Sequence, residues 1–154
     1  MRNEQSMKQV KIWTISPLNL SKIKRVTLFL KLVNIETLVP VFINQLESQS
    51  ILKALRNRVP PNRPLVHGVL LSLMGDAGFS LFGVEIYDIH DDILLARLLF
   101  EGQSYSAEKP LMSPITPFDA CVLATLAARP IYVAENVIEQ IGVPAGIELD
   151  KFRI

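Results

Sequence analysis

The chain has 154 residues, of which 49% are hydrophobic and 20% charged, and its mean hydropathy is +0.30. This composition excludes an intrinsically disordered chain, because such chains combine low hydrophobicity with high net charge. The length suits a single domain and suffices for a hydrophobic core without a disulfide or a structural metal. Cys121 is the only cysteine, which excludes an internal disulfide and a zinc site built from several cysteines.

The net charge of +1 conceals an asymmetry between the two halves of the chain. Residues 1–77 contain 11 Lys and Arg against 4 Asp and Glu, whereas residues 78–154 contain 5 against 11. A basic half is typical of polyanion binding, but it fits equally well a contact with the acidic half of a second copy. The charge split and the apolar composition together predict a homo-oligomer, most simply a dimer.

No segment predicts a membrane span or a leader. The first six residues have no apolar stretch behind them, so we expect no signal peptide. The longest uncharged apolar stretch, residues 64–75, is shorter than the roughly 20 residues that a bilayer-spanning helix needs. We therefore expect a cytoplasmic protein with no membrane partner.

Three strands are predicted before residue 44. Residues 9–15 and 25–33 alternate between the two faces of a strand, residues 16–19 between them predict a loop, and residues 37–43 form the third strand. Because Pro40 lacks an N–H, we expect the third strand to lie at an edge or to bulge there. A basic face with aromatic residues, suited to single-stranded nucleic acid or to an ordinary sheet or subunit contact, would comprise Lys11, Trp13, Arg25, Phe29 and Lys31.

Two helices are predicted next. Asn44 caps the first, and Glu47 three residues later completes a capping box. Its buried stripe would consist of Leu46, Ile51, Leu52 and Leu55. The second helix, from about Pro64 to Gly75, is apolar around most of its circumference. We expect another backbone to approach it closely along the small residues Gly68, Ser72 and Gly75.

The second half of the chain predicts a central hairpin. Residues 79–89 and 93–100 are apolar on both faces, so we expect both faces of this hairpin to be covered. Residues 105–109 are predicted to add a third strand to the meander.

A helix is then predicted to open at Thr116, with Pro117 and Asp119 in its first turn. A short strand at residues 131–133 and a short helix at residues 135–141 follow. This order of elements predicts an α+β fold with a mixed, largely antiparallel sheet and helices packed against it.

Four blocks of sequence follow one another in the order of one family's motifs. Val-Pro-Val-Phe-Ile-Asn at 39–44 and Glu-Ser-Gln-Ser-Ile at 47–51 correspond to Leu-Pro-Ile-Trp-Ile-Gly and Glu-Ala-x-x-Ile. Asn-Arg-Pro-Leu-Val-His-Gly at 62–68 corresponds to Pro-Arg-Pro-Leu-Thr-His-Asp. Ser-Pro-Ile-Thr-Pro-Phe-Asp-Ala at 113–120 corresponds to Asp-Ala-Arg-Pro-Ser-Asp-Ala, and Pro-Ile-Tyr-Val at 130–133 to the family's Ala-Pro-Ile-Tyr-Val. The chain therefore resembles the bifunctional nuclease domain family.

The resemblance implies a single domain over residues 1–154, with a family-like core at about 39–142. The predicted strands within 8–33 would precede this core, and a short tail at 143–154 would follow it. The resemblance also implies a nuclease that hydrolyses phosphodiester bonds of DNA, RNA or both.

Glu47, Arg63, His67 and Asp119 are the candidate catalytic residues. Phosphodiester hydrolysis needs positive charge at the phosphoryl oxygens and a group that activates water, usually carboxylates that hold a divalent cation such as Mg²⁺ or Mn²⁺. Arg63 would grip a phosphate bidentately. Each of these residues also has a structural alternative. The two acids would cap helices, the histidine would lie in the core, and the arginine would form a structural ion pair.

Three replacements leave a second function open. The family's acid after the histidine is Gly68 here, its arginine before the second proline is Thr116, and its serine after that proline is Phe118. The alternative is a catalytically inactive, oligomeric binding protein that retains the fold and takes nucleic acid or a protein partner.

Overall fold

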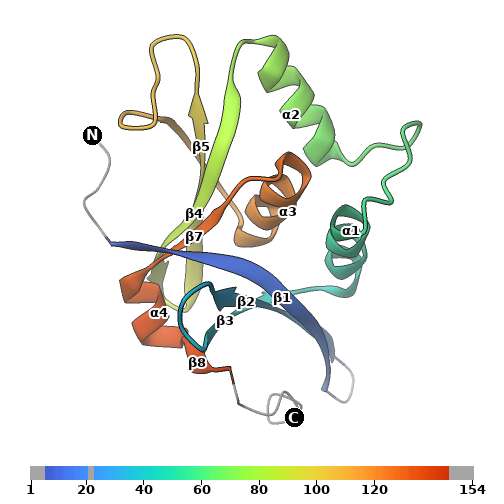
Figure 1. The fold of residues 1–154 in the computed structure, drawn as a ribbon. Coiled ribbons are helices and arrows are strands. Elements are labelled where there is room, and N and C mark those ends of the chain that lie inside the picture. The colour runs from blue at the N-terminus through green and yellow to red at the C-terminus, as the bar shows by residue number, and fades with distance from the viewer. Residues whose placement is uncertain (1–5, 21–22, 146–154) are drawn as a thin grey trace.

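The computed structural model describes residues 6–20 and 23–145, and these form one eight-stranded sheet with four helices (Figure 1). The strands are β1 (Met7–Leu20), β2 (Ile23–Leu32), β3 (Thr37–Ile43), β4 (Ser80–His90), β5 (Ile93–Glu101), β6 (Leu111–Ile115), β7 (Ile131–Ala134) and β8 (Val143–Pro144). The helices are α1 (Gln45–Leu55), α2 (Val66–Asp76), α3 (Pro117–Ala127) and α4 (Glu135–Ile141). The predicted α+β class is confirmed.

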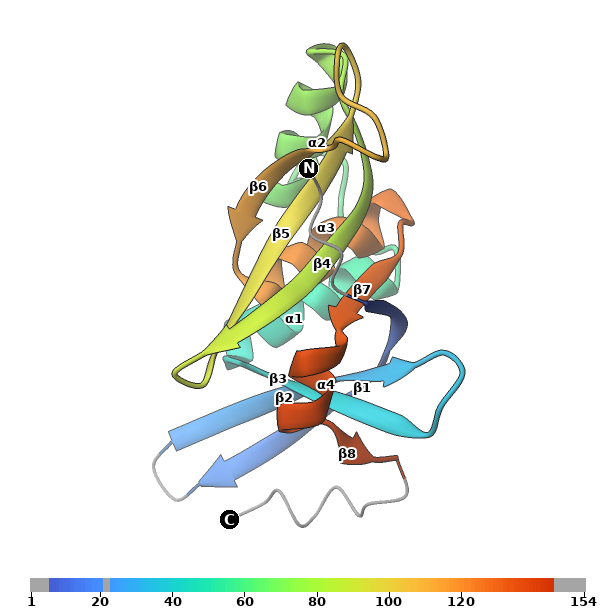
Figure 2. The same cartoon turned by 90° about the vertical axis from the view of Figure 1, so that its left-hand side faces the viewer.

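The sheet is mixed but largely antiparallel, with the order β6-β5-β4-β7-β1-β2-β3-β8. Among the described strands, only β4 and β7 pair in parallel. Figures 1 and 2 show α1, α2 and α3 on one side of the sheet and α4 on the other. The strands of the β4–β5 half cross those of the β1–β3 half steeply (Figure 2), and α3 packs in the angle between the halves.

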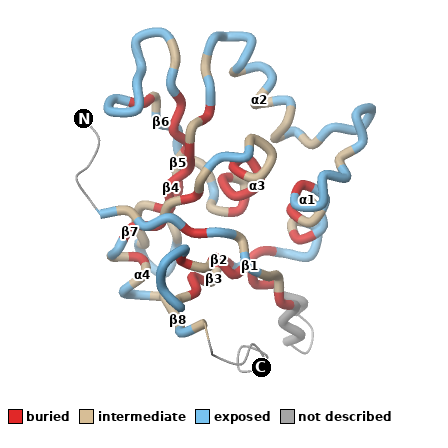
Figure 3. Tube along the Cα trace, in the orientation of Figure 1, coloured by how far each residue is buried: buried red, intermediate tan, exposed pale blue. Residues whose placement is uncertain are grey.

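Helix α3 supplies the centre of the hydrophobic core. Its side chains Phe118, Ala120, Cys121, Val122, Leu123 and Ala124 are all buried. The alanines keep the helix thin, so that it packs closely against the strands and against its neighbours α1 and α2. Figure 3 shows the contrast with α2, which is exposed or half-buried along its whole length.

Strand β1 joins the two halves of the sheet and leaves part of one edge open. Strand β7 pairs with it only from Met7 to Val10, whereas β2 pairs with it from Val10 to Leu20. From Lys11 onward, the edge of β1 that faces away from β2 has no strand partner in the described part of the chain. The predicted loop at 16–19 is wrong, because these residues continue β1, where an open edge tolerates Pro17.

Two predictions about the first helix and its preceding strand have different outcomes. Strand β8 pairs only with Thr37 and Leu38, so β3 is an edge strand at Pro40, as predicted. The capping box of α1 is confirmed, but its predicted buried stripe is confirmed only at Ile51. Leu46 is 75% exposed, and the buried side chains are Ser48, Ile51 and Ala54. The stripe is thus narrower than the apolar residues suggest, because α3 and β2 cover only one side of α1.

Helix α2 is much more exposed than its apolar sequence predicts. Val66 and Leu73 are 81% and 62% exposed, and no residue of this helix is fully buried. A Cβ added at Gly68 or Gly75 would meet no atom within 4 Å, so no backbone of the described chain approaches there. The reason is that α2 extends from the end of the molecule, and in the described chain its main contacts are with α3 and β4 (Figure 1).

The third strand of the meander lies later than predicted. Residues 105–109 form a turn, in which Tyr105 bridges Gly102 and Ser106 N–H donates to the carbonyl of Lys109. Strand β6 begins at Leu111 instead and pairs with β5. It includes Pro114, which the sheet accommodates because β6 is the edge strand.

Candidate functional site

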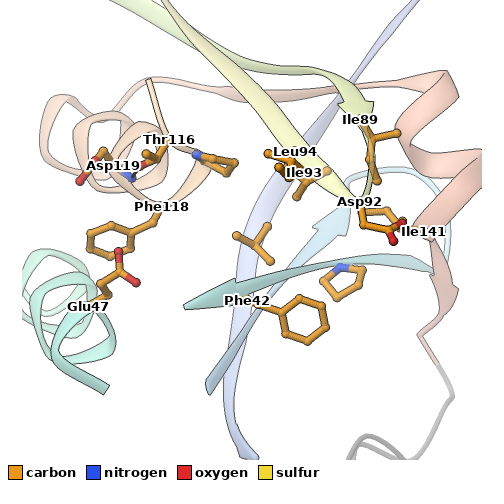
Figure 4. Close-up of a pocket in the computed structure, with 13 residues that line it drawn as sticks. Phe42, Glu47, Ile89, Asp92, Ile93, Leu94, Thr116, Phe118, Asp119 and Ile141 are labelled. Atoms are coloured by element: carbon orange, nitrogen blue, oxygen red, sulfur yellow. Dashed lines mark hydrogen bonds between the residues drawn. The ribbon is translucent and has the colours of Figure 1, made fainter. Parts of the chain in front are cut away.

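A pocket of about 580 Å³ opens where α1 and α3 begin. Its walls come from β3, the first turns of α1 and α3, the β4–β5 turn and the end of α4. Figure 4 shows Glu47, Thr116, Phe118 and Asp119 together at one end, and Asp92 with Ile141 at the other. The pocket therefore combines a polar end, formed by two helix N-termini, with an apolar wall.

The charged residues of this pocket are all acids. Glu47, Asp92 and Asp119 line it, and the lining includes no lysine or arginine. Phe42 is 62% exposed and belongs to the apolar wall with Ile93. Negative charge beside an apolar wall does not attract a phosphate unless a cation accompanies it.

Asp119 is held by hydrogen bonds on both carboxylate oxygens. Its Oδ1 lies 2.8 Å from Nε2 of His67, and its Oδ2 accepts from the hydroxyl of Thr116 at 2.7 Å. Thr116 is the N-cap of α3, and its Oγ1 also accepts from the Asp119 N–H at 3.2 Å. The carboxylate is thus oriented by two different elements, the start of α3 and the first turn of α2.

His67 joins α2 to α3 by this hydrogen bond. A carboxylate only accepts hydrogen bonds, so Nε2 of the imidazole carries the shared proton. The ring also packs edge-on against Phe118, with 6.0 Å between the ring centroids. Nδ1 is buried and has no hydrogen-bond partner in the described part of the chain. Because its second nitrogen does not reach water, His67 is suited to orient Asp119 rather than to exchange protons with solvent.

Glu47 is a helix cap with one carboxylate oxygen left over. Its Oε1 accepts from the Asn44 N–H at 2.9 Å, and its own N–H donates to Asn44 Oδ1 at 2.8 Å. No protein group among the described residues donates a hydrogen bond to Oε2. Glu47 therefore caps helix α1 as expected, and the cap uses only one of its two carboxylate oxygens.

Arg63 lies apart from the other three candidates. It is exposed in the segment between α1 and α2, and its backbone N–H donates to the carbonyl of Pro60 at 3.1 Å. Within the described chain its guanidinium makes no hydrogen bond or ion pair, and it is not among the residues that line the pocket. The structure thus brings Glu47, His67 and Asp119 to one region and leaves Arg63 free at the surface.

The donors at this site do not form a metal centre. Across residues 6–20 and 23–145, no group of three or more His, Cys, Asp or Glu side chains is arranged to hold a metal ion. Both oxygens of Asp119 and one of Glu47 are already hydrogen-bonded. The residues present therefore do not fit a divalent cation held by the protein alone.

The basic and aromatic face predicted on the first two strands is largely wrong. Phe29 is fully buried, and Lys31 forms an ion pair with Glu36 at 3.1 Å. The side chain of Arg25 lies outside the described residues. Only Lys11 and Trp13 remain exposed as predicted, because β2 is an interior strand whose central side chains enter the core.

A second polar pair, which the sequence did not indicate, lies within the sheet. Glu85 of β4 is fully buried and accepts from Nε of Arg97 on β5 at 3.0 Å. The Arg97 guanidinium also lies 4.2 Å from the ring centroid of Tyr87. These residues face each other across the β4–β5 ladder, away from the pocket lining, and stabilise the sheet.

Comparisons with known proteins identify the family of the chain. The family profile described as the bifunctional nuclease domain matches residues 28–146. Two Mycobacterium tuberculosis proteins, "Uncharacterized protein MT1877" of strain CDC 1551 / Oshkosh and "Uncharacterized protein Rv1829" of strain ATCC 25618 / H37Rv, are each 31% identical over 125 residues. The aligned region covers 80% of this chain and 71% of each relative. Since the matched profile covers well over half of the chain, the chain belongs to the bifunctional nuclease domain family.

Proposed function

We propose that the protein hydrolyses phosphodiester bonds of DNA, RNA or both at the polar end of the pocket. The hydrogen bond between His67 and Asp119 carries the proposal, because it brings residues 52 positions apart together in the region that Glu47 shares. Two helix N-termini open onto the same end, and their backbone dipoles favour a phosphoryl group.

Each residue has a distinct role in this proposal. The free oxygen of Glu47 takes the proton from the attacking water, as a general base positioned by its own helix cap. As the water oxygen bonds to phosphorus, the bond from phosphorus to the sugar oxygen breaks, and that oxygen leaves and takes a proton from solvent. Asp119, oriented by His67 and Thr116, positions that water. Arg63 does not line the pocket, so the proposal gives it no contact with the phosphate that is cleaved.

The test is cleavage of fluorescent single-stranded DNA and RNA by highly purified protein, in Mg²⁺, in Mn²⁺ and in EDTA. Glu47→Gln is the sharpest variant, because glutamine also completes a capping box and removes only the base. We expect cleavage to fall by about 10²- to 10⁴-fold, which is the usual contribution of a general base. Glu139→Gln, an exposed acid of α4, is the matched control and retains full activity.

Equal cleavage by the wild type and the Glu47→Gln variant would mean a contaminating nuclease or another site. Asp119→Asn is less clean, because it also weakens the bond to His67.

The absence of any cation from the pocket lining favours a second candidate function, a binding protein without catalysis. In that case the wild type would cleave neither substrate in any of the three buffers while it still bound nucleic acid or a protein partner.

A further inference from the structure

Three surface depressions that share lining residues follow one another along β1 and α1. The first lies between β1 and the end of α3, the second between β1 and α1, and the third along α1 itself. The first two share Ile12 and Leu55, and the last two share Leu52 and Arg56. Figure 1 shows β1 passing below α3 and α1, the helices that form the other wall. We call this surface the β1–α1 groove.

The β1–α1 groove is strongly basic. Five exposed cations line it: Lys11, Lys53, Arg56, Arg58 and Arg129. No aspartate or glutamate is among its lining residues. None of these five side chains forms an ion pair within the described chain. Unpaired cations along a groove produce a potential that attracts a polyanion.

Trp13 adds an aromatic surface in the middle of this basic groove. It is 46% exposed and lines the depression between β1 and α1 together with Arg56. The register of β1 with β2 shifts between Ile12 and Thr14, so Trp13 is the extra residue of a β-bulge. Bulges redirect side chains and often accompany functional sites. A half-exposed indole beside a guanidinium is a stacking surface for an unpaired base.

We propose that the β1–α1 groove binds single-stranded nucleic acid, with its phosphates along the five cations and a base stacked on Trp13. A duplex does not offer this contact, because its bases are already stacked on one another. The choice of nucleic acid over other polyanions rests on the proposed nuclease function. The groove then holds the chain, while the acidic pocket holds the bond to be cleaved.

The test uses the intact protein in EDTA, so that binding is measured without cleavage. Trp13 is the only tryptophan, so its emission reports this groove specifically. We expect a 12-nucleotide oligo(dT) or oligo(U) to quench that emission. Whichever of the two binds more tightly shows whether the groove prefers DNA or RNA. Fluorescence anisotropy with labelled oligonucleotides should show affinity falling roughly tenfold or more in Trp13→Ala. A 12-base-pair duplex should bind at least tenfold more weakly.

Charge variants give a second readout that a misfolded protein would not reproduce. Arg56→Gln and Arg129→Gln should each lower the slope of log affinity against log salt by about 0.7. The matched controls are Lys109→Gln and Tyr105→Ala, an exposed cation and an exposed aromatic residue outside the groove, and both should bind as the wild type does. Circular dichroism checks that every variant is folded.

Three results would overturn the proposal: unchanged Trp13 emission at saturation, groove variants that bind as the controls do, or a salt-sensitive dimer that oligo(dT) cannot dissociate. The last result would identify the acidic half of a second copy as the occupant. A protein that binds as expected but never cleaves would refute the nuclease function and leave the groove proposal intact.

Discussion

Nε2 of His67 and Oδ1 of Asp119 lie 2.8 Å apart, although 52 residues separate them in the sequence. The contact joins the first turn of α2 to the first turn of α3. It orients the carboxylate of Asp119, which is hydrogen-bonded to two side chains, His67 and Thr116. It is therefore the contact whose strength most directly tests the site.

A double-mutant cycle measures this contact. We expect His67→Ala and Asp119→Ala each to destabilise the protein, with a coupling energy of about 0.5–3 kcal/mol between them. Because the cycle subtracts the separate cap and packing losses, only the pair remains. Urea unfolding of the wild type, both single variants and the double variant gives the value. A coupling energy near zero would mean that the side chains do not interact in solution.

The role of Glu47 in capping α1 can be tested separately from its proposed role in catalysis. Asn44→Ala removes the side-chain acceptor of the capping box and should cost about 1 kcal/mol of stability. Glu47→Gln keeps an acceptor for the Asn44 N–H and should leave stability almost unchanged. Thermal melts measure both. If Glu47→Gln were the more destabilising of the two, the carboxylate would matter to the fold rather than to catalysis.

The buried pair in the sheet should matter far more for stability than a surface pair. Arg97→Ala leaves the fully buried Glu85 without its partner on β5, which typically costs about 3–5 kcal/mol. Glu36→Ala breaks the ion pair between Lys31 and the largely exposed Glu36, and should cost less than about 1 kcal/mol. Denaturant midpoints of the two variants provide the comparison, and similar losses would contradict it.

Cys121 should be chemically silent in the folded protein. Burial in α3 raises the pKa of its thiol to about 12, so almost no reactive thiolate exists at neutral pH. We expect negligible reaction with a thiol reagent at about pH 8, and full reaction once urea unfolds the chain. The raised pKa also means that this thiol's contribution to stability is lost as the pH rises from 9.0, its ordinary value, through 12. Cys121→Ala should therefore flatten the alkaline decline of the melting temperature.

We propose that the protein is a homo-oligomer, most simply a dimer, and that the exposed face of α2 contributes to its interface. Val66, Val69 and Leu73 are exposed and, at spacings of three and four residues, share one face of this helix. Light scattering at micromolar concentration should show a dimer, which Leu73→Lys weakens. A monomeric wild type would refute the proposal.

The described residues contain no helix that is both long and apolar enough to cross a membrane.

Local signals in the sequence determined most of the elements and the caps of α1 and α3, although they misplaced residues 16–19 and 105–109. The Asn44–Glu47 capping box and the Thr116 cap before Pro117 and Asp119 depend on residues three positions apart, and both form as predicted. Strand alternation and the order of strands and helices likewise sufficed for the α+β class. Such features are set by neighbours along the chain, so no alignment or structure is needed to find them.

Contacts between distant segments were decided only by the tertiary structure. The pairing of His67 with Asp119 and the β1–α1 groove each require helices and strands that the chain brings together over many residues. The exposure of α2 and the burial of Phe29 show the same limit. An apolar side chain favours burial, but the sequence does not tell whether another element of the fold covers it. Which element packs on which face depends on the global arrangement of the sheet, and that arrangement is a property of the whole chain rather than of any segment.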